Sequence, residues 1–249
     1  MKKSIFNIIS TVGLLFVLFS TFVNAQKKKP TTKQTPVPKT TITKPPATVI
    51  PTSSTVSSTS SDYSLAQEEQ AILDEINAVR NNPQKYISYL EEYRKNFKGN
   101  IVTIVGAVPM VTVEGVTAVD DAISFLKTVT KLPPYSASKG LTQSANLQLK
   151  DLMEDSSIGH KSKDGGNLTT RVDKFGLVGN IYAENITYGT KTPRNIVMLM
   201  ILDDGVKSRS HRKNIFSPEF KIIGIGFGTG NKGESLSVTV FADSFKEKN

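Results

Sequence analysis

Apolar residues recur at helical spacing through much of the chain after residue 62. Ile72, Ile76 and Val79 form one apolar stripe. The sequence Asn81-Asn82-Pro83 ends that helix and begins the next one, since proline suits a first helical turn. The spacing of apolar positions predicts helices near residues 65–81, 83–97, 119–129, 141–152 and 196–202.

Short apolar runs between turn residues predict strands at 101–105, 110–113, 181–186, 222–227 and 236–245. Helices and strands are mixed without a regular βαβ alternation, so the predicted fold class is α+β. Gly224, Gly226 and Gly228 alternate along one of these runs, and no helix follows them. They therefore indicate a closely packed strand rather than a nucleotide-binding loop.

The first 25 residues are typical of a secretory signal peptide. Lys2 and Lys3 precede a largely apolar stretch over 5–23, and Val23-Asn24-Ala25 is a small-residue cleavage pattern. An uncleaved anchor is the alternative, but polar residues interrupt the apolar stretch. We expect a mature protein without a membrane span, secreted to the extracellular space, the periplasm or the cell envelope.

Residues 26–61 consist mainly of Thr, Ser, Pro and Lys, and hold six of the twelve prolines. Such a composition predicts a disordered linker, which could serve as a spacer or bring lysines to anionic wall polymers. Eight lysines precede residue 62, so 23 basic and 22 acidic side chains remain in the predicted domain at 62–249. This near-neutral balance gives no electrostatic support to nucleic-acid binding. The chain has no cysteine, so that domain depends on its core, and the short signal and lack of disulfides indicate a bacterial source.

The candidate chemistry lies in two histidines and nearby acids. His160 and His211 occur in polar, Gly/Ser-rich segments, where either a site or simple surface exposure would account for them. Glu184 interrupts an apolar strand, which is costly unless the carboxylate is paired or coordinates an ion. Asp203 and Asp204 end a helix, where the dipole disfavours acids, so they either cap a loop or face a cation.

Four short motifs resemble those of CAP domains (cysteine-rich secretory protein, antigen 5, pathogenesis-related 1), in the same order. They are Leu132-Pro-Pro-Tyr135, Gly159-His160-x-Ser162-x-Asp164-Gly165, Ala183-Glu184-Asn185-Ile186-x-Tyr188-Gly189 and Ser210-His211-Arg212-Lys213-Asn214-Ile215-Phe216. The segments 112–126 and 203–211 also resemble a bacterial, SCP-like extracellular branch of the family. The resemblance covers about residues 65–245, which is the whole predicted folded part.

The resemblance implies an α-β-α sandwich with a central antiparallel sheet, and a cleft lined by two histidines and two acids. By position the cleft residues are His160, Glu184, His211 and Asp203, with Asp204 as the alternative fourth residue. Met200 stands where relatives often have tryptophan. Two imidazoles with carboxylates could bind a divalent metal such as zinc, could hold a water as acid and base, or could form a polar network without an ion.

Three functions follow from this resemblance. The first, which we favour, is a secreted, non-catalytic module that binds a metal and a small lipid, peptide or cell-wall ligand. The second is a metal-assisted hydrolase of the peptidase type, and the third is an envelope protein in which the 26–61 spacer matters most. No nucleophile-elbow motif surrounds Ser162, so we interpret it as a turn residue near Asp164. Arg171, Arg212 and Asn214 are predicted to hold loops by hydrogen bonds.

Overall fold

The structure is a computed structural model that describes residues 63–104, 109–155, 158–230 and 235–248. The predicted signal peptide at 1–25 and the linker at 26–61 lie outside these residues, as does part of the strand predicted at 101–105.

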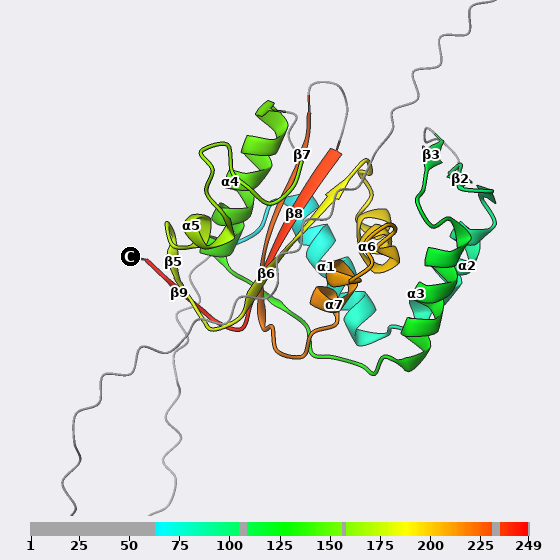
Figure 1. Ribbon diagram of the computed structural model, residues 1–249. Helices are drawn as coiled ribbons and strands as arrows, with labels where there is room; N and C mark the ends of the chain where they lie inside the picture. Colours follow the sequence, from blue (N-terminus) through cyan, green and yellow to red (C-terminus); the bar gives the residue numbers. More distant parts are fainter. Residues whose placement is uncertain (1–62, 105–108, 156–157, 231–234, 249) are drawn as a thin grey trace, which may run out of the picture.

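Helices and strands follow one another without a repeating unit, as expected for an α+β fold (Figure 1). The helices are α1 (Gln67–Asn81), α2 (Lys85–Arg94), α3 (Val116–Thr128), α4 (Lys139–Asp155), α5 (Leu168–Val172), α6 (Pro193–Leu202) and α7 (Ser210–Ile215). The strands are β1 (Phe97–Lys98), β2 (Ile101–Val102), β3 (Met110–Val111), β4 (Ser136–Ala137), β5 (Gly176–Val178), β6 (Tyr182–Tyr188), β7 (Ile222–Thr229), β8 (Ser235–Ala242) and β9 (Phe245–Glu247).

The central sheet has the strand order β4-β7-β8-β6, which makes β6 an edge strand. β7 and β6 both pair antiparallel with β8, and Val240 lies between Gly224 and Glu184 in the register. The short β4 runs parallel to β7, so the expected antiparallel sheet has one parallel strand at its other edge. β1–β3 and β5–β9 form two smaller antiparallel sheets.

Helices cover both faces of the central sheet, which confirms the predicted α-β-α sandwich (Figure 1). One core cluster joins α1, α6 and α7 to one face, and Ile223, Ile225 and Phe241 belong to it. The second cluster joins α4 and α5 to the other face, and Val238 and Val240 belong to it. The alternation along each strand, with successive residues on opposite faces, therefore divides the interior into two layers.

The glycines of β7 let α4 approach the sheet closely. A Cβ added at Gly224 would lie 2.1 Å from the backbone carbon of Leu141 and 2.2 Å from the amide nitrogen of Thr142. A helix backbone cannot yield at such a distance, so residue 224 needs a hydrogen as its side chain. The prediction that these glycines belong to a closely packed strand is confirmed.

A buried arginine joins α1 to the end of α7. Arg80 is 1% exposed, and its guanidinium donates hydrogen bonds to the carbonyls of Pro133, Ile215 and Ser217. It also stacks on the ring of Tyr135, 3.7 Å from the centroid. Carbonyls at a helix C-terminus favour a cation, so Arg80 fixes the position of the short helix that carries His211.

Within the described part of the chain, no helix is both long enough and apolar enough to cross a membrane.

Candidate paired histidine site

The site is built around two consecutive residues of the edge strand β6. Glu184 is 4% exposed and Asn185 is fully buried. Successive side chains of a strand point to opposite faces, so Glu184 faces the α4 layer and Asn185 faces the α6–α7 layer. The sequence expectation that Glu184 sits in a buried strand is confirmed, and its partners explain how the charge is tolerated.

Glu184 binds one histidine and one arginine. Its Oε1 lies 2.9 Å from Nδ1 of His160, and its Oε2 accepts a hydrogen bond from Nη2 of Arg171 at 2.5 Å. The other terminal nitrogen of Arg171 donates to the carbonyl of His160 at 3.1 Å and to Oγ of Ser162 at 3.0 Å. Arg171 therefore neutralises Glu184 and attaches the histidine loop to it, which confirms its predicted role in holding a loop.

The loop that carries His160 is fixed from α4 and β6. Nε2 of Gln148 donates to the carbonyls of Gly159 and Lys161, at 2.8 and 3.1 Å. The Gly159 amide donates to the hydroxyl of Tyr188 at 3.2 Å. These bonds place the backbone on both sides of His160, so the imidazole has little freedom to leave the carboxylate.

Asp203 pairs with the second histidine. Its Oδ1 lies 2.8 Å from Nδ1 of His211, and its Oδ2 accepts a hydrogen bond from the Arg212 amide at 3.1 Å. The contact between Oδ1 and Nδ1 is within ion-pair distance but lacks the alignment of a hydrogen bond. Among the described residues, this buried oxygen therefore has no hydrogen-bond donor. Asp203 has left-handed backbone angles, φ 53° and ψ 39°, at the end of α6. This turn directs its side chain toward α7.

Asp204, the alternative fourth residue, has a different task. Its two carboxylate oxygens accept hydrogen bonds from the amides of Val113 and Glu114, both at 2.7 Å. It holds the segment that precedes α3, and of the two neighbouring acids it is Asp203 that lies against a histidine.

Asn185 links the two halves of the site. Its Nδ2 donates to the carbonyl of His211 at 3.1 Å, and its Oδ1 accepts from Nδ2 of Asn214 at 2.8 Å. The segments carrying His160 and His211 are therefore attached to adjacent residues of β6, one on each face of the strand. Asn214 was predicted to hold a loop, but it lies in α7, and the same contact attaches that helix to β6.

Arg209 and Arg212 flank the sequence segment of His211; Arg212 was predicted to hold a loop, whereas its network with Arg209 was not predicted. Arg209 has a left-handed backbone (φ 53°) and makes a two-pronged contact with Glu114, with both oxygens at 2.7 Å. Arg209 and the buried Arg212 also share one carboxylate oxygen of Asp121, at 2.9 and 3.0 Å. Hydrogen bonding to Arg209 holds the pKa of the Glu114 carboxyl below its usual value. Burial lowers the pKa of the Arg212 guanidinium, although Asp121 opposes this shift.

The two histidine–acid pairs have matching exposure. The imidazoles of His160 and His211 are 15% and 16% exposed, whereas the carboxylates of Glu184 and Asp203 are fully buried. Each imidazole uses Nδ1 toward its acid, and its Nε2 makes no hydrogen bond with the described residues. Each pair can therefore present one oriented imidazole nitrogen to a ligand.

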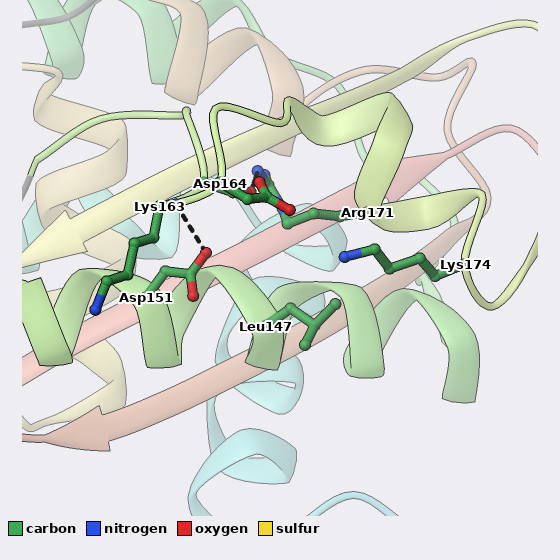
Figure 2. A pocket seen from close by; sticks show the side chains of 7 residues that line it. Leu147, Asp151, Lys163, Asp164, Arg171 and Lys174 are labelled. Carbon is green, nitrogen blue, oxygen red and sulfur yellow. Dashed lines mark hydrogen bonds between the residues drawn. The ribbon is translucent and has the colours of Figure 1, made fainter.

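Metal-ligand geometry is limited to these pairs. In the part of the chain that the structure describes, no group of three or more histidines and acids is arranged to hold a metal ion. A pocket lies beside Arg171 and Ser162, and neither histidine lines it (Figure 2).

Helices cover both faces of a mostly antiparallel sheet, and two histidine–acid pairs are attached to its edge strand. This is the arrangement of a CAP-type domain. The model of the CAP cysteine-rich secretory protein family matches residues 73–242, and the chain belongs to this family. Despite the family's description, this member has no cysteine, so it keeps the fold without a disulfide.

Several proteins resemble parts of this chain. The uncharacterized protein YkwD of Bacillus subtilis is 31% identical over 96 residues, which is 39% of this chain and 35% of YkwD. An outer surface protein of Borrelia burgdorferi is 20% identical, with a TM-score of 0.37 over 47% of this chain and 80% of that one. An extracellular SCP-domain protein of Bacillus anthracis is 18% identical, with a TM-score of 0.34 over 52% of this chain and 38% of that one. The chain thus spans about a third of the length of YkwD.

Proposed function

We propose that this chain is a secreted, non-catalytic CAP module that uses His160 and His211 to bind a divalent ion such as Zn²⁺, together with a small lipid, peptide or cell-wall ligand. One observation carries the proposal. Nδ1 of His160 and Nδ1 of His211 lie 2.9 and 2.8 Å from oxygens of buried carboxylates, and the two imidazoles are 15% and 16% exposed.

This arrangement matches the way proteins prepare histidine for metals. A metal-ligating imidazole commonly donates its second ring N–H to a carboxylate, which fixes the tautomer and raises the basicity of the ligating nitrogen. Glu184 and Asp203 would therefore orient the two imidazoles rather than bind the ion themselves. A bound ion would supply a Lewis acid to which an oxygen or nitrogen of the second ligand attaches. The proposal requires the Nε2 atoms of both histidines to reach one ion beyond the edge of β6, and with only two protein nitrogens water would complete the coordination.

The engagement of the carboxylates favours binding over hydrolysis. Both oxygens of Glu184 are occupied, by His160 and by the Arg171 guanidinium. Neither oxygen of this carboxylate is left free to bind and orient an attacking water. A peptidase remains the second candidate, because an acid that orients the Nδ1 side of a histidine is also the arrangement of a general base.

Thermal unfolding with and without Zn²⁺ tests the proposal. The chain without residues 1–25 should gain about 2.7 kcal/mol of stability at a hundredfold excess of free Zn²⁺ over Kd. The gain should vanish in His160→Ala and His211→Ala, and should persist in the controls Lys161→Ala and Lys213→Ala, which replace the exposed neighbour of each histidine.

Two results would contradict the proposal. An unchanged melting temperature with Zn²⁺ would remove the metal site. Hydrolysis of a peptide library that disappears in both histidine variants, while they remain folded, would replace the binding module with the peptidase.

A further inference from the structure

The structure assigns a second binding site to this domain, in a pocket that takes a small zwitterion with one carboxylate and one ammonium group, such as a free amino acid or a short peptide. The pocket lies between α4 and the segment 162–174 and has a volume of about 310 Å³. Its lining residues are Leu147, Asp151, Ser162, Lys163, Asp164, Arg171 and Lys174 (Figure 2).

The cationic part of the wall consists of one buried arginine and one exposed lysine. Arg171 is 1% exposed, and its Nε–H is buried without a partner among the described residues. Because this Nε–H has almost no accessible surface, Arg171 supports the wall from behind and a ligand in the pocket does not reach its donor. The ammonium group of Lys174 reaches into the pocket beside Arg171 in Figure 2, and no ion pair within the described residues occupies it. The ammonium group of Lys174 can receive a carboxylate.

The acidic part of the wall is held in place by backbone amides. Asp151 accepts the amide of Lys163 through Oδ2 at 3.0 Å, and Asp164 accepts the amide of Gly166 through Oδ1 at 2.8 Å. The second oxygen of each carboxylate makes no hydrogen bond with the described residues. Because one oxygen is fixed by the backbone, the other is presented to the pocket at little entropic cost, and both can receive an ammonium group.

A ligand with both charges fits this wall better than one with a single charge. A simple anion would be repelled by Asp151 and Asp164, and a simple cation would leave the Lys174 ammonium without a counter-charge. The remaining lysine of the wall, Lys163, has its Nζ 4.0 Å from Glu154, so it is directed toward that acid. Leu147 adds an apolar surface for an aliphatic side chain.

The size of the pocket agrees with a small ligand. A volume of about 310 Å³ is at the lower end of the range for small-molecule sites and equals the share of about ten waters in the liquid. A single amino acid or a dipeptide fits in that space.

This site is distinct from the histidine pairs. None of His160, Glu184, Asp203 and His211 lines it. Arg171 and Ser162 belong to its wall and also support the loop of His160, but the binding proposed here requires neither a metal nor either imidazole.

Titration of the full chain with diglycine, followed by amide chemical shifts, tests the assignment. Saturable shifts should appear around residues 151, 163–166 and 174. Lys174→Met should weaken diglycine binding by at least about tenfold, because it removes a charge-assisted contact. Lys174 is exposed, so this change should leave folding intact, and Lys127→Met, an exposed lysine on α3, is the matched control that should bind normally. Asp151→Asn should also weaken binding while its side-chain oxygen still accepts the Lys163 amide.

Four results would overturn the assignment. The first is the absence of saturable shifts at tens of millimolar diglycine, and the second is unchanged binding in Lys174→Met. The third is acetate or methylamine alone binding as tightly as diglycine, which would define a site for one charge only. The fourth is inorganic phosphate binding more tightly than diglycine, which would define a simple anion site.

Discussion

Arg171 and Glu184 form an ion pair that is buried on both sides. Nη2 of the arginine lies 2.5 Å from Oε2 of the glutamate, and the side chains are 2% and 0% exposed. Removing two charges from water costs several kcal/mol per ion, and close contact with further hydrogen bonds offsets this cost. The carbonyl of His160 and the hydroxyl of Ser162 supply those further bonds, so the pair and the histidine loop stabilise one another.

The first prediction concerns the loss of one partner. Arg171→Met should lower the free energy of unfolding by about 3–5 kcal/mol, because the Glu184 carboxylate remains buried without its cation. Urea unfolding followed by circular dichroism measures the change.

A double variant separates the pair from simple loss of packing. Combining Arg171→Met with Glu184→Gln should cost clearly less than the two single changes added together, since no unpaired charge remains. Strictly additive losses would show that the two residues act independently and would contradict the prediction.

Much of this fold could be predicted from periodicity. The long helices have apolar residues at helical spacing, and the helix predicted from Ile72, Ile76 and Val79 corresponds to α1. The central strands were predicted from short apolar runs. Phe97 continued the stripe of α2 by spacing, but it lies in β1, because α2 ends at Arg94. The predicted helix 83–97 was therefore too long at its C-terminal end.

Short polar elements escaped the sequence analysis. α7 has the sequence SHRKNI, which has no apolar stripe, and it is held by contacts from Arg80 and Asp203 that come from elsewhere in the chain. The same holds for the choice between Asp203 and Asp204. These neighbours have the same chemistry, and only the left-handed turn at Asp203 decides which one lies against His211. The ion-pair partner of Glu184 could not be identified either, because contacts distant in sequence leave no local pattern.

The second prediction tests the close packing of α4 on β7. Gly224→Ala should destabilise the domain by about 3 kcal/mol or more, because the new methyl group would collide with the backbone of Leu141 and Thr142. Gly228→Ala, in the same strand, is the matched control. Its nearest neighbour is the flexible Met153 side chain at 2.9 Å, so it should cost much less. Equal thermal shifts for the two variants would contradict the proposed contact.

The third prediction is a pH dependence of stability. The pKa of Glu114 is lowered, first by its hydrogen bonds to Arg209. A lowered pKa in the folded state means that the contribution is present above the unfolded value of about 4.3 and is lost as pH falls through the folded value. Glu114→Gln should therefore cost about 1–2 kcal/mol at neutral pH, and the difference from the parent chain should shrink in acid.

An exposed pair provides the comparison for Glu114. Glu92 contacts Lys95 at 2.6 Å, but both side chains are about 70% exposed. Glu92→Gln should leave the melting temperature almost unchanged at any pH, since exposed pairs contribute little. Thermal unfolding across the acid range compares the two variants. A loss in Glu114→Gln that stays constant down to strong acid would rule out its ionised form as the cause.

The fourth prediction separates folding from ligand binding at Asp203. Asparagine tolerates the left-handed backbone at this position, and its side-chain oxygen can still accept the Arg212 amide, so Asp203→Asn should unfold at nearly the same temperature as the parent chain. The charge that orients His211 is lost, however, and removing such a partner typically lowers metal affinity by about 10- to 100-fold. Calorimetric titration with Zn²⁺ measures this loss directly. If Asp203→Asn binds Zn²⁺ as tightly as the parent chain while His211→Ala does not, the acid is only a helix cap, and His211 binds the metal without its help.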